Sequence, residues 1–191
     1  EMSERAQECL NVETPKILSN STVCVTGSVR ELCAAAEKAC GELGFCPEVL
    51  TTSLNCEARE AGAFLAAIAR EHAGRGERRA FILGGETVVH LTGNGKGGRN
   101  QEIVLSAARG MEGLNGALLF SIGSDGTDGP TDAAGGWCDG ETIRKMREKG
   151  VCAEAALRNN DAYRALDAIG NLIKTGATGT NVNELTVLLV E

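Results

Sequence analysis

Apolar runs and amphipathic stretches alternate along the first half of the chain. Residues 22–26 (Thr-Val-Cys-Val-Thr) predict a buried strand, and residues 29–43 follow with the apolar period of a helix, with Ser28 as its N-cap. Residues 47–52 predict a second strand and residues 57–73 a second helix. The buried face of that helix is expected to hold Ala61, Phe64, Leu65, Ile68 and Ala69. Repeated strand–helix units of this kind predict a parallel sheet.

The pattern changes after a third strand, predicted at residues 80–83. Another apolar stretch, residues 86–91, follows after only two glycines, a spacing that suits a hairpin. Residues 100–110 predict a helix, residues 116–122 a strand and residues 185–190 a closing central strand. Three more helices are expected at residues 141–149, 153–158 and 162–169, the last with Asp161 as N-cap. We therefore expect an α/β fold with a mixed, largely parallel sheet and helices on both faces.

Three polar, glycine-bearing loops interrupt these elements, at residues 84–102, 123–136 and 174–183. Two of them follow predicted strands, and the third precedes the last strand. Ligands of open α/β sheets gather at strand ends. We expect the three loops to converge at one edge of the sheet and to form a site there.

Composition narrows the class of protein. The chain has 191 residues, of which 42% are hydrophobic, so it can bury a full core as one domain or as two intimate lobes. The net charge of −7 argues against broad nucleic-acid binding, which normally requires a basic face. No apolar run approaches the roughly 20 residues that span a bilayer. The amino end also lacks a signal-peptide pattern.

The cysteines indicate the compartment. There are eight, with no CxxC pair, and several lie in apolar periodic segments, which favours free buried thiols over disulfides. His72 and His90 are too isolated to indicate a zinc site. We therefore expect a soluble, cytoplasmic protein. A mitochondrial location and a homo-oligomer are compatible with the same features.

The first loop has the residues of an anion-binding site. Glycines such as Gly97 and Gly98 permit close approach to the main chain, and Lys96 and Arg99 add positive charge. Asn100 and Glu102 open a predicted helix, whose N-terminal amides attract anions. Arg99 is the strongest single candidate, because a guanidinium can hold a carboxylate or phosphate with two parallel hydrogen bonds. The competing interpretation is a surface ion pair between Arg99 and Glu102, with Lys96 solvated.

The same loop contains a formal dinucleotide fingerprint, Gly93-x-Gly95-x-x-Gly98. The match is weak, because the preceding strand looks like a hairpin arm and the expected acid could only be Glu112, in a predicted turn. A Walker A loop is excluded, since no Gly-Lys pair is followed by Ser or Thr. Nucleotide binding of a different type and a plain turn both stay open.

The second loop concentrates acids. Asp125 and Asp128 lie among glycines with Ser124 and Thr127, which suits either magnesium binding or local hydrogen bonds within a turn. Thr180 and Asn181 of the third loop add a hydroxyl and an amide. Together the three loops offer groups for binding cations, anions and hydroxyls, as phosphoryl transfer requires.

Four ordered motifs give the sequence a family resemblance. Gly84-Gly-Glu-Thr87, Gly97-Gly-Arg-Asn-Gln-Glu102, Gly123-Ser-Asp-Gly-Thr-Asp-Gly-Pro-Thr-Asp-Ala-Ala-Gly135 and Thr178-Gly-Thr-Asn-Val-Asn183 resemble the carboxyl-terminal half of the class II glycerate kinases. That half includes the MOFRL domain, and members are often labelled hydroxypyruvate reductase. The resemblance extends from about residue 20 to the end and includes Asn159-Asn-Asp-Ala-Tyr163.

The resemblance implies a kinase that transfers phosphate from ATP to the 2-hydroxyl of glycerate with the help of Mg²⁺. Arg99 matches the family's cleft arginine. We expect catalytic roles for Arg99, Asp125 and Asp128, the last two as metal ligands, because acids this close together need a cation or hydrogen-bond donors to compensate their charge. Substrate or nucleotide contacts are expected from Lys96, Gly97, Gly98, Asn100, Glu102, Ser124, Thr127, Thr180 and Asn181.

The resemblance also implies a missing part. Family members carry a larger amino-terminal domain that contributes a lysine to the cleft, and this chain begins at Glu1 without room for it. We therefore expect residues 1–191 to be the carboxyl-terminal domain of a longer enzyme, folded but poorly active alone. The alternatives are a nicotinamide-dependent hydroxypyruvate reductase and a non-catalytic module that binds a nucleotide or metabolite.

Overall fold

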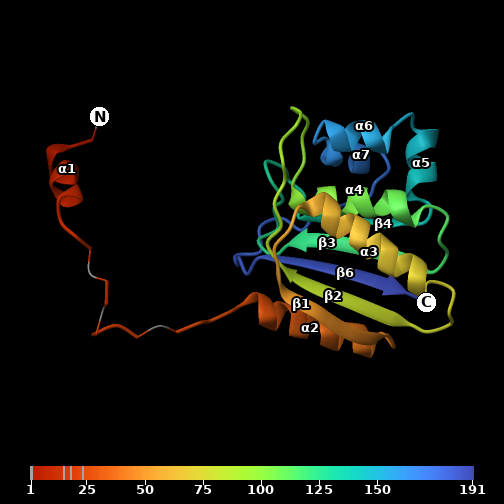
Figure 1. The fold of residues 1–191 in the computed structure, drawn as a ribbon, viewed down its shortest axis with the longest axis horizontal. Coiled ribbons are helices and arrows are strands. Elements are labelled where there is room, and N and C mark those ends of the chain that lie inside the picture. Colours follow the sequence, from red (N-terminus) through yellow and green to blue (C-terminus); the bar gives the residue numbers. More distant parts are fainter. Residues whose placement is uncertain (1, 15, 18, 23) are drawn as a thin grey trace.

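A mixed six-stranded sheet forms the centre of the computed structural model, which describes residues 2–14, 16–17, 19–22 and 24–191. The strands are β1 (Cys46–Leu54), β2 (Arg79–Gly85), β3 (Ala117–Gly123), β4 (Gly135–Asp139), β5 (Leu172–Ile173) and β6 (Glu184–Val190). The helices are α1 (Glu4–Leu10), α2 (Val29–Glu42), α3 (Ala58–His72), α4 (Arg99–Met111), α5 (Thr142–Glu148), α6 (Ala153–Arg158) and α7 (Ala162–Asp167). Helices cover both faces of the sheet (Figure 1), so the expected α/β class is confirmed.

The strand order is β1-β2-β6-β3-β4-β5, and only the first pair is parallel. The closing strand β6 is central, as expected, but it runs antiparallel to both of its neighbours, β2 and β3. It lies between β2 and β3, which the strand–helix repeat predicts to be direct neighbours. The sheet is therefore mixed but mostly antiparallel, and the expectation of largely parallel pairing is corrected.

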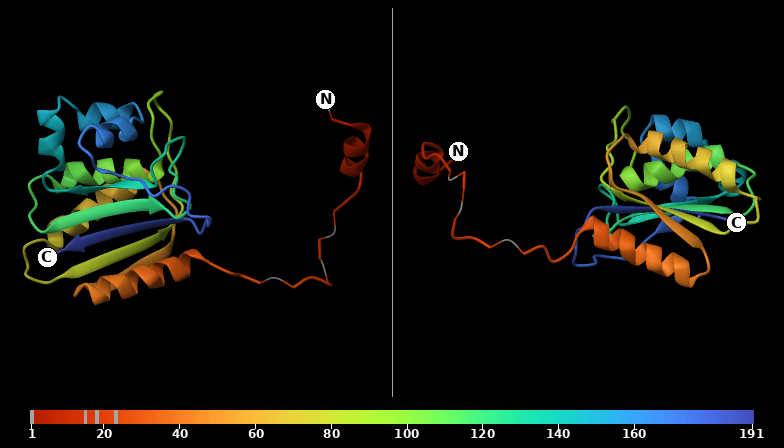
Figure 2. Two further views of the ribbon diagram at one scale, coloured as in Figure 1. Left: turned by 180° about the vertical axis from the view of Figure 1, so that it is seen from behind. Right: turned by 60° about the horizontal axis from the view of Figure 1, so that its bottom comes forward.

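One helix, α2, covers one face of the sheet (Figure 2). The Ser28 hydroxyl accepts from the Glu31 amide, which confirms the expected N-cap. Cys33 and Cys40 lie on the inner side of the helix, in a cluster with Ile82 and Val187 of the sheet. Burial raises the pKa of both thiols, as expected for small apolar core residues rather than disulfide partners.

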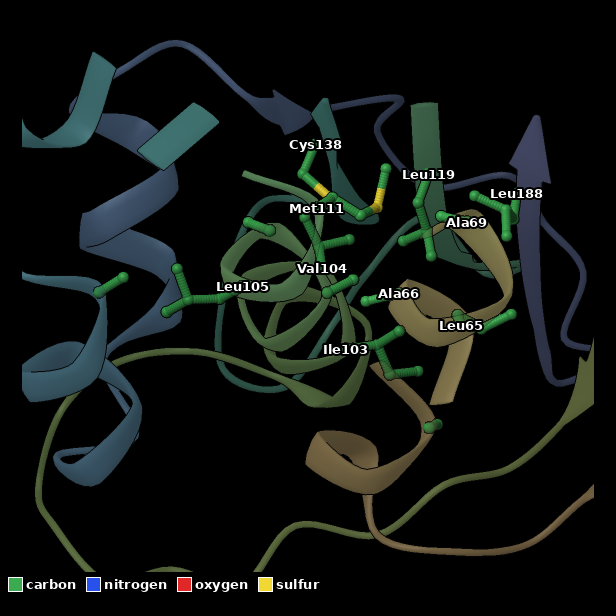
Figure 3. Close-up of a cluster of buried hydrophobic side chains, with 14 of the residues drawn as sticks. Leu65, Ala66, Ala69, Ile103, Val104, Leu105, Met111, Leu119, Cys138 and Leu188 are labelled. Carbon is green, nitrogen blue, oxygen red and sulfur yellow. The ribbon is translucent and has the colours of Figure 1, made fainter. Parts of the chain in front are cut away.

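The larger core lies on the opposite face, where α3 and α4 pack on the sheet (Figure 3). Leu65 of α3, Ile103 and Val104 of α4, and Leu119 and Leu188 of the sheet are fully or almost fully buried there. A side chain at Gly62 would overlap the Ile103 carbonyl, so this glycine lets the two helices approach closely. The packing holds α4, and with it Arg99 at its first position, in a fixed place against the sheet.

Two expected strands are wrong. Residues 22 and 24–26 form no strand, and Val25 is 73% exposed; residue 23 lies outside the described residues. Residues 86–91 form no hairpin arm, since their one ladder contact is an isolated parallel bridge between Val88 and Glu57. Phe64 is also misplaced, because it is 59% exposed on the outer side of α3.

The amino-terminal helix α1 stands apart from the sheet and its helices in both views (Figures 1 and 2). None of its residues is buried. Within the described residues, none of the helices has both the length and the apolar character needed to cross a membrane.

Candidate active site

Residues from all three polar loops line one cavity of about 170 Å³. The cavity lies where β2, β3 and α4 lead into or out of loops and where β6 begins. It is referred to below as the Arg99 cavity. Its walls include Arg99 and Asn100 from the first loop, Asp125, Thr127 and Asp128 from the second, Asn181 from the third, and Glu184 at the start of β6.

Arg99 lies between two carboxylates in this cavity. Its Nη1 donates to Oε1 of Glu86 at 2.7 Å, and its Nε lies 2.7 Å from Oε1 of Glu184. The surface ion pair between Arg99 and Glu102, considered from the sequence, is absent from the ion pairs of the described residues. The guanidinium is therefore oriented from two sides, while 40% of the side chain stays exposed toward the cavity and its surroundings.

Glu184, the first residue of β6, is 5% exposed. Its Oε2 accepts from the Thr87 amide at 3.1 Å and from the Thr87 hydroxyl at 3.2 Å. Burial raises the pKa of this carboxyl, and its contacts with Thr87 and Arg99 oppose the shift only in part. Sequence reasoning missed Glu86 and Glu184, although Glu86 lies inside the Gly84-Gly-Glu-Thr87 motif and Glu184 directly follows the third loop.

Asp128 caps helix α4 from a distant loop. Its Oδ1 accepts from the amide and side chain of Asn100 at 3.1 and 3.2 Å, and its Oδ2 accepts from the Gln101 amide at 2.9 Å. The N-cap residue of the helix is Gly98, which has no side chain to do this. Burial nevertheless raises the pKa of Asp128, because the loss of hydration outweighs these bonds.

A buried polar chain continues below Asp128. The Asn100 side chain accepts from the Ser121 hydroxyl at 2.6 Å, and that hydroxyl lies 2.7 Å from the hydroxyl of Thr186. These contacts link α4 to β3 and β6 beneath the cavity. These buried hydrogen bonds hold the floor of the cavity in place.

Asp125 has a different role from Asp128. Its Oδ1 accepts from the amide and hydroxyl of Thr127 at 2.9 and 3.1 Å, as in a local turn. Its Oδ2 makes no hydrogen bond within the described part of the chain, and the residue lines the cavity. One oxygen of Asp125 thus remains available to a ligand, whereas both oxygens of Asp128 are engaged by α4.

The second and third loops are tied together at Ser124. Its hydroxyl accepts from the Val182 amide at 2.7 Å, and its amide donates to the Asn183 carbonyl at 3.0 Å. These bonds place Asn181 at the cavity. Thr180 does not line the cavity, and its main chain contacts the Thr178 hydroxyl instead. Ser124 is therefore placed as a loop connector, and Thr180 lies at the surface.

The glycine loop of residues 92–98 is held by the turn at residues 159–161. The Asn160 side chain accepts from the amides of Thr92 and Gly93 at 2.7 and 3.0 Å and donates to the His90 carbonyl at 3.1 Å. Its φ of +52° is one of two positive values among non-glycine residues in the described chain. The amides of residues 92–96 thus donate to the turn at residues 159–161 and are not free to bind an anion.

The Asn159-Asn-Asp turn also accounts for the glycines of the formal fingerprint. Side chains at Gly93 and Gly95 would overlap this turn, and one at Gly98 would overlap the Asp128 carboxyl. The segment before the loop is no strand of the sheet. The glycines therefore serve close packing between loops, and the geometry of a dinucleotide fold is absent from this part of the described chain.

Comparison with known proteins decides the family. Residues 79–184, which contain all the cavity residues named above, match the model of the MOFRL family. The chain belongs to the MOFRL family. The match begins at the first residue of β2 and ends at Glu184, so it covers β2 to β5 and the three loops, but only the first residue of the central strand β6.

Relatives of this MOFRL chain include two kinases. The chain is 50% identical to a D-glycerate 2-kinase of Thermotoga maritima and 44% identical to a glycerate 2-kinase of Pyrococcus horikoshii. Both matches cover 100% of the chain, but only 46% and 42% of the relatives. A crystal structure of a glycerate kinase from Thermotoga maritima superposes with a TM-score of 0.90 at 50% identity, covering 100% of the chain and 47% of that protein. The chain thus spans about half the length of the curated relatives it matches.

Some residues expected at the site lie elsewhere in the MOFRL fold. Lys96 places its Nζ 4.3 Å from the centre of the Tyr163 ring, away from the Arg99 cavity. Glu102 is 2% exposed and pairs with Nε of Arg59 at 2.6 Å and with Nδ2 of Asn160 at 3.2 Å. Gly97 and Gly98 line a neighbouring cavity instead. The contacts of Glu102 connect α4 to α3 and to the turn at residues 159–161.

The carboxylates of the MOFRL site differ in their fit to a magnesium ion. Among the described residues there is no group of three or more His, Cys, Asp or Glu side chains placed to hold a metal alone. Magnesium at phosphoryl-transfer sites is held by one or two carboxylates together with substrate phosphates and water. The free oxygen of Asp125 fits that donor set, and Asp128, already engaged by Asn100 and Gln101, fits it poorly.

Proposed function

We propose that this chain is the carboxyl-terminal domain of a glycerate 2-kinase, which transfers the γ-phosphoryl group of ATP to the 2-hydroxyl of glycerate. The observation that carries the proposal is the Arg99 cavity, where all three polar loops meet around one oriented guanidinium. The whole of the chain is similar to part of each of two glycerate 2-kinases, which supports the proposed substrate and reaction. A cytoplasmic location remains a prediction.

The residues of the cavity suit phosphoryl transfer, in which positioning and charge neutralisation supply most of the catalysis. In the reaction, the glycerate hydroxyl oxygen forms a bond to the γ-phosphorus as the bond between that phosphorus and ADP breaks, and the hydroxyl proton passes to water. Arg99 would bind a carboxylate or phosphate oxygen through its guanidinium. Asn181 and Thr127 line the same cavity and would donate or accept hydrogen bonds from the substrate. Asp125 would hold magnesium, which, when bound, neutralises phosphate charge.

The proposal includes a second domain. The chain matches less than half of each kinase relative, so the remainder of the relatives would supply the opposite wall of the cleft. A half-site does not exclude water or align two reactants. We therefore propose that residues 1–191 fold but turn over poorly alone, and that a longer protein with the preceding domain is active.

The alternatives are less favoured. A hydroxypyruvate reductase would need a nicotinamide site, and the fingerprint that suggested one is used for packing against the Asn159–Asp161 turn. A non-catalytic module would not explain why the Arg99 guanidinium is oriented from two sides or why one Asp125 oxygen remains available in the cavity.

Two assays on the longer protein separate these functions. The proposal predicts ADP formation that depends on both glycerate and ATP, with no oxidation of NADH in the presence of hydroxypyruvate. The same assays on residues 1–191 alone should give negligible turnover. NADH oxidation without ADP formation would replace the kinase by the reductase, and ligand binding without either reaction would support the module.

A further inference from the structure

A second cavity of about 550 Å³ lies beside Arg99. It shares Arg99 and Gly129 with the Arg99 cavity, so the two are neighbours around one guanidinium. Its walls are formed by Val89, Leu91 and Pro130 together with the main chain of the glycine loop. It is referred to below as the Leu91 cavity.

The two cavities differ in chemistry. Four carboxylates (Glu86, Asp125, Asp128 and Glu184) and one guanidinium line the smaller Arg99 cavity. The Leu91 cavity has only Glu102 as an acid, and that side chain is neutralised by Arg59 and bonded to Asn160. The charged residues of the Leu91 cavity are thus Glu102 and Arg99. Glu102 is paired with Arg59, whereas the partners of Arg99, Glu86 and Glu184, line the Arg99 cavity instead.

The apolar side chains of the Leu91 cavity lie partly in water. Leu91 is 81% exposed at this cavity, although it is a large hydrophobic residue. The loop that carries it is not loosely held, because Asn160 bonds to the main chain of His90, Thr92 and Gly93 on either side of it. A fixed, exposed apolar wall gains free energy when a flat apolar group covers it.

We infer that the Leu91 cavity binds the nucleoside of the phosphoryl donor, while the Arg99 cavity holds glycerate. The inference rests on the proposed kinase function and assigns its two substrates to two cavities. A purine base is flat and largely apolar, and suits a larger pocket with apolar walls and few polar groups. Glycerate is small and polar throughout, and suits the smaller polar cavity. Arg99, shared by both, lies where donor phosphates and acceptor would meet.

A third cavity beside Arg99 is the competing location for the base. Its walls carry hydroxyls and amides from Thr52, Ser53, Asn55 and Thr87. Such groups suit sugar or phosphate oxygens better than the face of a base. The choice between the Leu91 cavity and this hydroxyl-lined one is an outcome of the experiment below.

The first experiment measures steady-state kinetics of the longer enzyme with Leu91→Asp. A carboxylate introduced in the apolar wall should raise KM for ATP roughly tenfold or more, because a charge disfavours burial under a base. KM for glycerate should stay within about twofold. Leu43→Asp is the matched control, since Leu43 is 65% exposed at the end of α2 and lines none of these cavities. An unchanged KM for ATP, or a rise confined to glycerate, would overturn the assignment.

The second experiment measures binding of a fluorescent ADP analogue to residues 1–191 and needs no turnover. Leu91→Asp should weaken binding roughly tenfold, and Ser53→Asp should change it much less. If Ser53→Asp alone weakens binding, the base occupies the hydroxyl-lined cavity and the inference is wrong. If Leu91→Asp weakens binding but the longer protein forms no ADP, the nucleoside site stands and the kinase proposal fails. If the longer enzyme forms ADP but the analogue binds the wild-type and Leu91→Asp proteins equally well, the kinase proposal stands and the nucleoside site is wrong. Circular dichroism and the unfolding midpoint establish that each variant is folded.

Discussion

Nε of Arg99 lies 2.7 Å from Oε1 of Glu184, and this contact joins the first residue of α4 to the first residue of β6. Glu184 also holds Thr87 through its other oxygen, at 3.1 and 3.2 Å. The side chain that orients the arginine is therefore itself anchored to the loop after β2. This connection makes Glu184 a positioning residue whose removal should affect Arg99 without removing a group from the substrate.

Glu184→Gln should lower the activity of the longer enzyme while keeping it folded. Gln keeps an acceptor for Thr87 but removes the charge that faces Arg99, so the guanidinium is held less firmly. We expect kcat/KM to fall roughly 10- to 100-fold. The readout is steady-state kinetics, and Glu141→Gln is the control, because Glu141 is an exposed acid that lines none of the cavities around Arg99. Wild-type kinetics in Glu184→Gln would show that the contact does not position Arg99.

The raised pKa of Glu184 predicts a pH dependence of stability. A carboxyl whose pKa is higher in the folded than in the unfolded protein binds its proton more tightly when the protein is folded. Its contribution to the free energy of unfolding is therefore fully present below the ordinary pKa of 4.5 and is lost as pH rises through the folded pKa. We expect the free energy of unfolding of wild-type residues 1–191 to fall, relative to Glu184→Gln, as pH rises from about 4.5. Urea unfolding of both proteins across that range tests this. A difference that is constant with pH, or that has the opposite sign, would contradict it.

Replacing Asp128 should lower the stability of the domain, whereas replacing Asp125 should lower the activity of the longer enzyme. Asp128→Ala removes the acceptor of the Asn100 and Gln101 amides at the buried start of α4, so we expect it to lower the free energy of unfolding by about 2 kcal/mol or more. Asp125→Asn keeps the bond to Thr127 and should leave stability within about 0.5 kcal/mol. The same variant should weaken the magnesium dependence of the longer enzyme. Equal stability loss in both, or unchanged magnesium dependence in Asp125→Asn, would refute this division.

Asn160 should contribute far more to stability than its neighbour Asn159. Asn160→Ala leaves the amides of Thr92 and Gly93 and one oxygen of buried Glu102 without partners, and it places alanine at a φ of +52°. We expect a loss of about 3 kcal/mol. Asn159→Ala is the matched control, because the exposed Asn159 side chain accepts one bond of 3.3 Å. Chemical unfolding of the two variants provides the measurement, and similar losses in both would contradict the prediction.

The sequence predicted the local elements well where one stretch of chain determines them. Apolar periodicity placed α2, α3 and α4 within one or two residues, and Ser28 was correctly recognised as a cap because its partner, Glu31, is three residues away. Strand pairing failed because β6 lies between β2 and β3, and no local pattern encodes that insertion. The strand β4 was missed because Gly135 and Gly136 have low strand propensity, and no local pattern encodes their antiparallel pairing with Ile122 and Ser121 of β3.

The site was predictable in its location but not in its internal roles. Three glycine-bearing loops at strand ends indicated where a cavity would form, and they do meet around Arg99. The partners of Arg99, however, come from residues 13 positions before it and 85 positions after it in the sequence (99 − 86 and 184 − 99), so nothing local identified them. Asp128 looked like Asp125 in sequence, and only the approach of α4 gives them different roles.

The most direct test of the account is a coupled ADP-release assay on the longer enzyme with Arg99→Ala, alongside Arg109→Ala. Arg109 is the matched control, because it lies in the last turn of the same helix and pairs with the half-buried Glu154, away from the cavities around Arg99. We predict that glycerate-dependent ADP formation falls at least roughly 100-fold in Arg99→Ala, since the guanidinium neutralises charge that no other residue of the cavity can. Arg109→Ala should keep wild-type activity. Full activity in Arg99→Ala, with glycerate and ATP both required, would contradict the claim that this cavity is the site of phosphoryl transfer.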